Sequence, residues 1–330
     1  MPAPEPSGAT DPASAGLVSV VVCFLDAEPF LAEAVASVYA QSYGQWELLL
    51  VDDGSSDEST AIAQRHAAAD PARVRYLEHP GHENRGVSAS RNLGIAQARG
   101  ELVALLDADD VWLPRRLERG VQLLREHPSA DMAYGESEYW RSWEGRRARH
   151  ADRVQPHGFR ADRVLRAPEL LLRYLTHAAS LPCPSALTVR RRALLDCGGF
   201  VDAFRGMYED QVFLARFCLH HDVYVANECW DRYRQHSDSL CAEAARSSHA
   251  SEARQAYLGW LRSFLEEEGM QGTPAWDALC YSEAAARHAG RGWYARLRRI
   301  GLRALTRARM ALRAGSRAPA VRSGGGSAKE

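Results

Sequence analysis

Residues 17–25 read LVSVVVCFL, a nearly unbroken run of apolar and mostly β-branched side chains. Such a run is typical of a strand that is buried on both faces of a parallel sheet. Three further apolar runs alternate with three helical patterns; the runs lie at 46–51, 74–77 and 102–106, and the helical patterns at 29–41, 57–69 and 87–98. This alternation predicts an α/β fold with a Rossmann-like, mostly parallel sheet that is covered by helices on both faces.

The alternation becomes looser in the second half of the chain. There the patterns predict helices at 114–126 and 208–219, and short strands at 186–189, 223–226 and 232–234. An Arg- and His-rich stretch at 140–163 has little periodicity and predicts a long surface loop. Helical patterns return beyond residue 237, so we expect a helical C-terminal extension.

The composition is that of a globular protein with a large core, since the 330 residues are 46% hydrophobic and 25% charged. A net charge of −1 excludes a generally basic nucleic-acid binder and a generally acidic, disordered chain. Seven cysteines without a CxxC pair indicate reduced thiols, and no apolar run approaches the ~20 residues of a membrane-spanning helix. Residues 1–16 lack the apolar segment of a signal peptide, so we expect a disordered leader and a cytoplasmic protein.

Two clusters of aspartates directly follow predicted strands, VDDGS at 51–55 and LDADD at 106–110. In an α/β sheet, ligands bind beyond the carboxyl ends of the strands. Asp107 and Asp109 lie on the same side of an extended segment, where two carboxylates repel each other unless a cation neutralises them. Oxygen ligands of this kind favour Mg²⁺ or Mn²⁺. The alternatives are a solvated acidic turn at 106–110 and an Asx turn with a helix cap at 51–55.

Two further segments carry candidate binding and catalytic residues. The sequence NRGVSASRNLG at 84–94 predicts a helix N-terminus near Gly86, whose amides, together with the donors of Arg91, suit a nucleotide. A plain surface helix is the alternative for this segment. In the pair Glu209-Asp210, one carboxylate could act as general base towards a hydroxyl, or the pair could simply compensate a helix dipole.

Taken in this order, the segments resemble the family 2 glycosyltransferases of the GT-A fold, over about residues 18–239. The resemblance rests on VSVVV at 18–22, GGF at 198–200, the Glu209-Asp210 pair, and the segments 51–55, 84–94 and 106–110. It implies a GT-A type sheet. It also implies that Asp53 contacts the nucleobase of a nucleotide-sugar donor and that Arg91 contacts the nucleotide.

The resemblance further implies roles for the acidic residues and for one histidine. Asp107 and Asp109 match the family's DxD motif, in which Asp107 contacts the nucleotide and the metal, and Asp109 is the more direct ligand of Mn²⁺ or Mg²⁺. Asp210 matches the catalytic base. His236, in RYRQHS at 232–237, matches a histidine that helps to hold the metal or the diphosphate. Considered without the family, His236 is more simply a structural residue.

The activity that the resemblance implies is a non-processive, inverting transfer of one sugar. The donor is a nucleotide-diphosphate sugar, UDP-linked, and the acceptor is a hydroxyl of a glycan, a lipid-linked molecule or a small molecule. The processive QxxRW motif is absent. Family members commonly have an aromatic residue and an Asn just after the first strand, where this chain has FLD at 24–26. The usual aromatic stacking on the nucleobase is therefore not expected to carry over directly.

Three other functions remain open at the level of sequence. One is a membrane-surface scaffold, which only the basic C-terminal end suggests. A nucleotidyltransferase that makes nucleotide sugars would need a Gly-rich, basic loop after the first strand, where this chain has CFLDAE at 23–28. A non-catalytic carbohydrate- or nucleotide-binding protein of the same fold should have lost Asp109 or Asp210, and both are present.

The resemblance also divides the chain. We expect a glycosyltransferase domain at 17–240, with a nucleotide-sugar half at 17–110 and an acceptor half at 111–240, followed by a helical basic extension at 241–314 and a flexible tail at 315–330. In 293–313, apolar side chains form an imperfect stripe among arginines, which is typical of a helix lying in a membrane interface. The alternative is a helix packed on the domain. We therefore expect peripheral contact with the inner face of a membrane, and no nucleic-acid partner.

Overall fold

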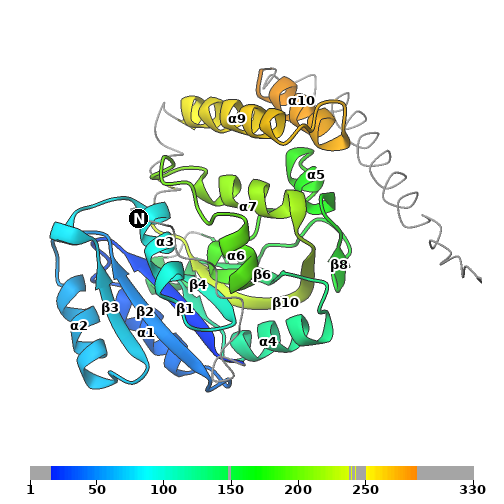
Figure 1. Cartoon of the computed structure of the whole chain (residues 1–330). Coiled ribbons are helices and arrows are strands. Elements are labelled where there is room, and N and C mark those ends of the chain that lie inside the picture. Colours follow the sequence, from blue (N-terminus) through cyan, green and yellow to red (C-terminus); the bar gives the residue numbers. More distant parts are fainter. Residues whose placement is uncertain (1–15, 148–149, 238, 240–241, 243–249, 288–330) are drawn as a thin grey trace, which may run out of the picture.

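The computed structural model describes residues 16–147, 150–237, 239, 242 and 250–287 (Figure 1). Within this part of the chain, the strands form one ten-stranded sheet. Its main path has the order β3-β2-β1-β4-β9-β6-β10-β5, while β7 pairs with β6 and β8 pairs with β10. Helices lie on both faces of this sheet (Figure 1), so the predicted α/β fold with a Rossmann-like sheet is confirmed.

The N-terminal half of the sheet is parallel, and each of its strands begins within a residue of the predicted position. Its elements are β1 (Val18–Phe24), α1 (Leu31–Tyr39), β2 (Trp46–Asp52), α2 (Ser59–Ala69), β3 (Val74–Glu78), α3 (Val87–Gln97) and β4 (Leu102–Asp107). Alternate residues of β1 face opposite sides of the sheet. Val20 and Val22 belong to one apolar cluster with α1, whereas Val21 belongs to another with Ile95 of α3. The prediction of a first strand buried on both faces is therefore confirmed.

The C-terminal half of the sheet mixes parallel and antiparallel pairs. Its elements are β5 (Val111–Trp112), α4 (Arg116–Glu126), β6 (Met132–Trp140), β7 (Arg153–Val154), β8 (Arg163–Leu165), α5 (Glu169–Leu175), β9 (Leu187–Arg190), α6 (Arg191–Asp196), α7 (Glu209–His220) and β10 (Val223–Arg234). Short 3₁₀ turns are η2 (Pro80–His82), η3 (Ser142–Arg147) and η4 (Pro184–Ala186). Strand β9 joins the two halves, because it is antiparallel to both β4 and β6.

Several details differ from the pattern-based predictions. The elements that were not predicted are strands β5, β6 and β8 and helices α5 and α6, and the expected loop at 140–163 contains the short strand β7. The two strands expected at 223–226 and 232–234 are one strand of twelve residues, β10. Its pairing with β6 shifts register between Val225 and Cys229 and again between Cys229 and Asp231, so the polar residues that interrupt the apolar pattern lie at an irregularity within one strand.

Two helices follow the sheet, α9 (Ala250–Glu267) and α10 (Pro274–Arg287). Helix α9 packs on α7 and α10 packs on α5, on the side of these helices away from the sheet (Figure 1). They form the described part of the expected helical extension. The leader at 1–16, apart from Gly16, the stripe at 293–313 and the tail at 315–330 lie outside the described residues. Among the helices of the described part, none is both long and apolar enough to span a bilayer.

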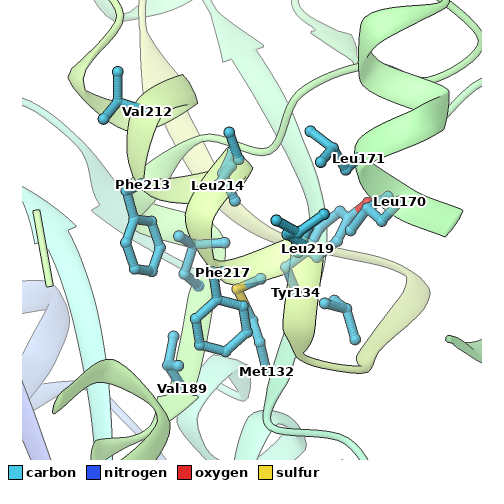
Figure 2. Packing of buried hydrophobic residues seen from close by; sticks show 14 of the residues in the cluster. Met132, Tyr134, Leu170, Leu171, Val189, Val212, Phe213, Leu214, Phe217 and Leu219 are labelled. Atoms are coloured by element: carbon cyan, nitrogen blue, oxygen red, sulfur yellow. The ribbon is translucent and has the colours of Figure 1, made fainter. Parts of the chain in front are cut away.

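We expect the core under α7 to dominate stability, with Phe213 as its most sensitive position. Phe213 and Phe217 point from α7 into the cluster around Met132 and Val189 (Figure 2), and both rings are fully buried. Phe213 also stacks on Phe200 at 4.5 Å between ring centroids. Phe213→Ala should lower the free energy of unfolding by about 3–5 kcal/mol, measured by urea denaturation.

The matched control is Leu195→Ala on α6, where the side chain is 51% exposed. That variant should stay within about 0.5 kcal/mol of the wild type. Equal losses in the two variants would mean that α7 does not anchor the core.

Candidate functional site

A cavity of about 940 Å³ opens at the carboxyl ends of β1, β2 and β4. Its lining includes all six residues that the sequence singled out: Asp53, Arg91, Asp107, Asp109, Asp210 and His236. They come from five separate places along the chain, from the end of β2 to the residues beyond β10. The sheet therefore brings the predicted residues to one place, as expected for ligands that bind beyond the ends of parallel strands.

The aspartates after β2 organise the local backbone. Asp52 accepts hydrogen bonds from the amides of Gly54 and Ser55, at 3.1 and 2.8 Å, and is the Asx turn that was the alternative for this segment. Asp53 Oδ1 accepts from the amides of Arg85 and Gly86, at 2.8 and 3.0 Å. Asp53 thus fixes the loop that precedes α3, and its contact with a nucleobase stays a prediction.

Arg91 joins the two acidic groups of the cavity. From α3, its guanidinium donates to Asp107 Oδ1 at 2.7 Å and lies 3.4 Å from Glu209 Oε1. The side chain is only 4% exposed, and it lies over the ring of Phe200. No basic residue lies close to Asp107 in the sequence, but in the fold Arg91 of α3 is its basic partner. Arg91 therefore ties the end of β4 to the start of α7.

His236 and Arg234 hold Asp109 in place. His236 Nε2 lies 3.0 Å from Asp109 Oδ2, so the two predicted metal-binding residues are in contact. The other ring nitrogen, Nδ1, is buried and has no hydrogen-bond partner in the described part of the chain. Arg234, at the end of β10, donates through Nε to the carbonyl oxygen of Asp109 at 2.7 Å. His236 therefore positions the carboxylate of Asp109, and Arg234 holds the backbone of the same residue.

Asp110 and Cys183 complete an acidic cluster that the sequence did not reveal. Potential ligand atoms of Asp107, Asp110 and Cys183 all lie within 4.8 Å of one another. Cys183 donates weakly to Asp110 Oδ2 at 3.4 Å, and Ser185 Oγ donates to the same oxygen at 2.6 Å. No sequence pattern links Cys183 to a position so far away along the chain. The signal for Asp110 was its place in the LDADD segment.

The carboxylates of this cluster fit a divalent cation. Burial raises the pKa of Asp107, and Arg91 only partly offsets that effect. Burial, together with the nearby charges of Asp109 and Asp107, raises the pKa of Asp110 well above its ordinary value. Crowded, buried carboxylates of this kind are stabilised in their ionised form by a metal ion. Asp107 of this cluster and Asp109, which lies outside it, supply oxygen donors of the kind that Mn²⁺ or Mg²⁺ prefers, and His236 contacts Asp109.

The second acidic group stands at the start of α7. Tyr208, which precedes it, has a left-handed backbone with φ of 70°. For a bulky residue this conformation costs on the order of 1–3 kcal/mol, and it persists only where the surrounding structure holds it. Asp210 accepts a hydrogen bond from the amide of Gln211 at 2.7 Å. Burial raises the pKa of Asp210, and burial raises the pKa of Glu209 to about 7 despite the opposing charge of Arg91.

Beneath the cavity, Asp231 of β10 makes stability depend on pH. It is fully buried, its Oδ1 accepts from Ser137 Oγ at 3.1 Å, and its Oδ2 has no hydrogen-bond partner among the described residues. Burial raises the pKa of Asp231 from 3.8 to about 7. The protonated carboxyl of Asp231 therefore favours the folded state. This contribution to the free energy of unfolding is complete below the unfolded pKa of 3.8 and is lost as the pH rises through the folded pKa of about 7.

Asp231→Asn removes the buried charge and should flatten this dependence. We expect the variant to gain roughly 2–4 kcal/mol over the wild type at about pH 8 and little at about pH 4, because one pKa unit corresponds to about 1.4 kcal/mol. Urea denaturation across this range measures the effect. Asp196→Asn, at an exposed position on α6, is the control and should change nothing. Parallel pH profiles for wild type and Asp231→Asn would contradict the assignment.

Known proteins that resemble this chain include glycosyltransferases, and the family whose model matches it is the one that the sequence motifs also resemble. The model of glycosyl transferase family 2 matches residues 19–197. The glycosyltransferase GlyG of Streptococcus pneumoniae serotype 4 is 37% identical over 120 residues, 36% of this chain and 38% of that protein. WfgD of Escherichia coli, a UDP-Glc:alpha-D-GlcNAc-diphosphoundecaprenol beta-1,3-glucosyltransferase, is 30% identical over 122 residues, 37% of this chain and 46% of that protein. The chain thus spans less than half the length of the curated relatives it matches.

Solved structures share the fold at low sequence identity. TarS 1-349 of S. aureus, in complex with UDP-GlcNAc, has a TM-score of 0.55 and 18% identity, covering 90% of this chain and 92% of that one. The mannosyltransferase PcManGT of Pyrobaculum calidifontis, in complex with GDP-Man and Mn2+, has a TM-score of 0.55 and 18% identity. The match covers 91% of this chain and 79% of that one. These likenesses confirm the GT-A fold. Because the family model matches more than half of the 330 residues, the chain belongs to glycosyl transferase family 2.

Proposed function

We propose that this protein is a non-processive, inverting glycosyltransferase that moves one sugar from a nucleotide-diphosphate sugar to an acceptor hydroxyl. The observation that carries the proposal is the bridge through Arg91. One buried guanidinium contacts both Asp107 of the DxD motif and Glu209, the neighbour of Asp210. Residues suited to a metal diphosphate and a residue suited to proton transfer are thereby held together at one cavity.

The donor side of the cavity is formed by the ends of β1, β2 and β4 and by the loop before α3. Asp53 shapes this loop and, in the proposal, faces the nucleobase, while Arg91 and Asp107 face the nucleotide. UDP is the nucleotide that we propose; a solved relative of the same fold binds UDP-GlcNAc and another binds GDP-Man with Mn2+. Leu25 lines the cavity and is 45% exposed, so an aliphatic side chain is available to contact a base there.

The metal in this proposal is Mn²⁺ or Mg²⁺, held by Asp109 and Asp107 with His236 beside Asp109. When bound, it would supply positive charge for the diphosphate that leaves. The residues around the two aspartates position them. His236 and Arg234 orient Asp109, and Arg91 keeps Asp107 in place next to α7.

Asp210 is the proposed general base. Burial raises its pKa, which makes the ionised carboxylate a stronger base towards a hydroxyl. The hydroxyl attacks from the face of the sugar opposite the diphosphate, and Asp210 takes its proton in a single displacement. The configuration at the sugar carbon therefore inverts. Glu209 is less suited to this role, because its carboxylate already contacts Arg91.

The acceptor half of the cavity is lined by β6 residues such as Ser137 and Tyr139, and by Leu181 and Tyr208. We propose a glycan, a lipid-linked molecule or a small molecule as acceptor, and work in the cytoplasm at the inner face of a membrane. The membrane part of this proposal rests on the arginine-rich stripe at 293–313, outside the described residues.

The proposed function is tested in two steps with the full chain. Thermal shift with UDP and with GDP, each with and without Mn²⁺, should show stabilisation that requires the metal. Release of the nucleoside diphosphate from UDP-glucose, UDP-GlcNAc and GDP-mannose should then identify a donor, and EDTA should stop the release. Metal-dependent UDP binding without turnover of any donor would favour the non-catalytic alternative. Neither binding nor turnover would contradict the proposal altogether.

A further inference from the structure

The residues between α6 and α7 form a loop that reaches the cavity from the acceptor side. We call residues 201–208 the 201–208 loop. Arg205, Gly206, Met207 and Tyr208 line the cavity, and the loop runs directly into Glu209 and Asp210. The conformation of this loop therefore sets where the proposed base stands.

Hydrogen bonds tie the loop to the donor side of the cavity. Arg205 Nη2 donates to the carbonyl oxygen and to Oδ1 of Asn84, at 2.6 and 2.9 Å. Ser88 Oγ, at the start of α3, donates to the carbonyl oxygen of Phe204 at 2.7 Å. These bonds hold the inner side of the loop against the segment that the sequence assigned to nucleotide binding.

Helix α9 holds the outer side of the same loop. The ring of Tyr257 stacks on Tyr208, with centroids 5.2 Å apart and planes at 13°. One turn later on α9, Trp260 meets Phe204 edge to face at 5.8 Å. Tyr257 is almost fully buried as a member of the core cluster, and α9 lies along α7 in Figure 1.

The stacked residue, Tyr208, is also the residue with the left-handed backbone. A bulky side chain keeps such a backbone only where its surroundings hold it there. Stacking on the buried ring of Tyr257 is the contact that immobilises the Tyr208 side chain, and Tyr208 in turn begins the helix that carries Asp210.

We propose that α9 is a positioning element of the active site: Tyr257 and Trp260 hold the 201–208 loop in the shape that places Asp210 at the donor. Neither Tyr257 nor Trp260 lines the cavity itself, so Tyr257 acts through Tyr208 and Trp260 acts through Phe204. The role of Asp210 in this inference rests on the proposed function, whereas the coupling of α9 to the loop does not.

Tyr257→Ala, Tyr257→Phe and Trp260→Leu test the proposal in the full-length protein. Tyr257→Phe keeps the stacked ring. Trp260→Leu changes a partly buried position and keeps the proposal testable if Tyr257→Ala fails to fold. Trp276→Ala is the matched control, because this tryptophan lies on α10 and packs under Arg262 of α9, and it takes no part in the two aromatic pairs that hold the loop. Two quantities are measured: amide hydrogen exchange of residues 201–210, and kcat and KM for release of the nucleoside diphosphate from the donor that the wild type uses.

Tyr257→Ala should speed exchange of 201–210 and lower kcat on the order of 10–100-fold with little change in donor KM, the cost of a misplaced catalytic group. Trp260→Leu should also speed exchange and lower kcat, to a smaller extent. Tyr257→Phe should keep both the exchange of 201–210 and kcat at their wild-type values. Trp276→Ala should leave both unchanged even where its melting temperature falls.

Faster exchange with an unchanged kcat would show a purely structural role and overturn the proposal. The same loss of kcat in Trp276→Ala, or unchanged exchange in Tyr257→Ala, would also overturn it. If the wild type turns over no donor, the proposed function fails, and the exchange data alone decide whether α9 holds the loop.

Discussion

Asp210→Asn is expected to lower turnover of the nucleotide sugar by about 10²–10⁴-fold, the usual contribution of general-base catalysis, while binding of UDP stays unchanged. Asparagine keeps the shape of the side chain and its bond from the amide of Gln211, but it cannot accept the proton of the acceptor hydroxyl. Steady-state kinetics and UDP binding by calorimetry separate the two quantities.

The pH dependence of kcat gives a second test of this residue. A general base must be ionised, so kcat should rise with pH through the pKa of Asp210. Burial raises that pKa, and the rise should therefore lie at higher pH than for an exposed aspartate. It should be absent in Asp210→Asn. Glu209→Gln is the control: if this variant is the one that loses kcat, then the base is Glu209, one residue earlier.

Asp109→Ala is expected to abolish the Mn²⁺-dependent stabilisation by UDP and to lower turnover on the order of 10³-fold, since several kcal/mol of charge stabilisation are lost. The carboxylate of Asp109 lines the cavity and contacts His236, and the backbone of this residue stays held by Arg234. The fold should therefore survive the substitution, which circular dichroism checks. Thermal shift with UDP at increasing Mn²⁺ measures the effect.

The acidic cluster offers a different ligand set, and Cys183→Ser distinguishes the two. Cys183 stands with Asp107 and Asp110 in the cluster, whereas Asp109 lies outside it. We expect Cys183→Ser to keep the Mn²⁺-dependent response, because hard oxygen ligands from Asp107 and Asp109 suffice. Loss of the response in Cys183→Ser with its retention in Asp109→Ala would assign the metal to Asp107, Asp110 and Cys183 instead.

The parallel half of the fold was predictable because its signals are local. The apolar run at 17–25 and the helical pattern that follows it reflect the contacts that the buried residues of β1 and α1 make with neighbouring layers. Strand β6 has no such signal, because its sequence MAYGESEYW includes polar residues that tertiary partners bury. Gly135 in that strand faces Trp230 so closely that an added Cβ would lie 2.6 Å from the indole ring. Only the fold reveals this contact.

The candidate site was predictable as a set of residues but not as a set of contacts. Asp107, Asp109 and Asp210 stand out because charged residues follow apolar strands or begin a helix. The partner that joins them, Arg91, lies 16 residues from Asp107 and 118 from Glu209 along the chain, and no spacing rule connects them. The tie between Tyr208 and Tyr257 is hidden for the same reason, since both look like ordinary core aromatics in the sequence.

The central claim is that this chain breaks the bond between a sugar and a nucleoside diphosphate and inverts the sugar carbon. Proton NMR of the anomeric signal follows that bond directly. It is recorded with the wild type, diamagnetic Mg²⁺ and UDP-glucose, UDP-GlcNAc or GDP-mannose, with water as the acceptor. We predict that the α signal of one donor disappears in a metal-dependent manner and that the first product formed has the opposite anomeric configuration. A first product of unchanged configuration, or no loss of signal from any of these donors, would contradict it.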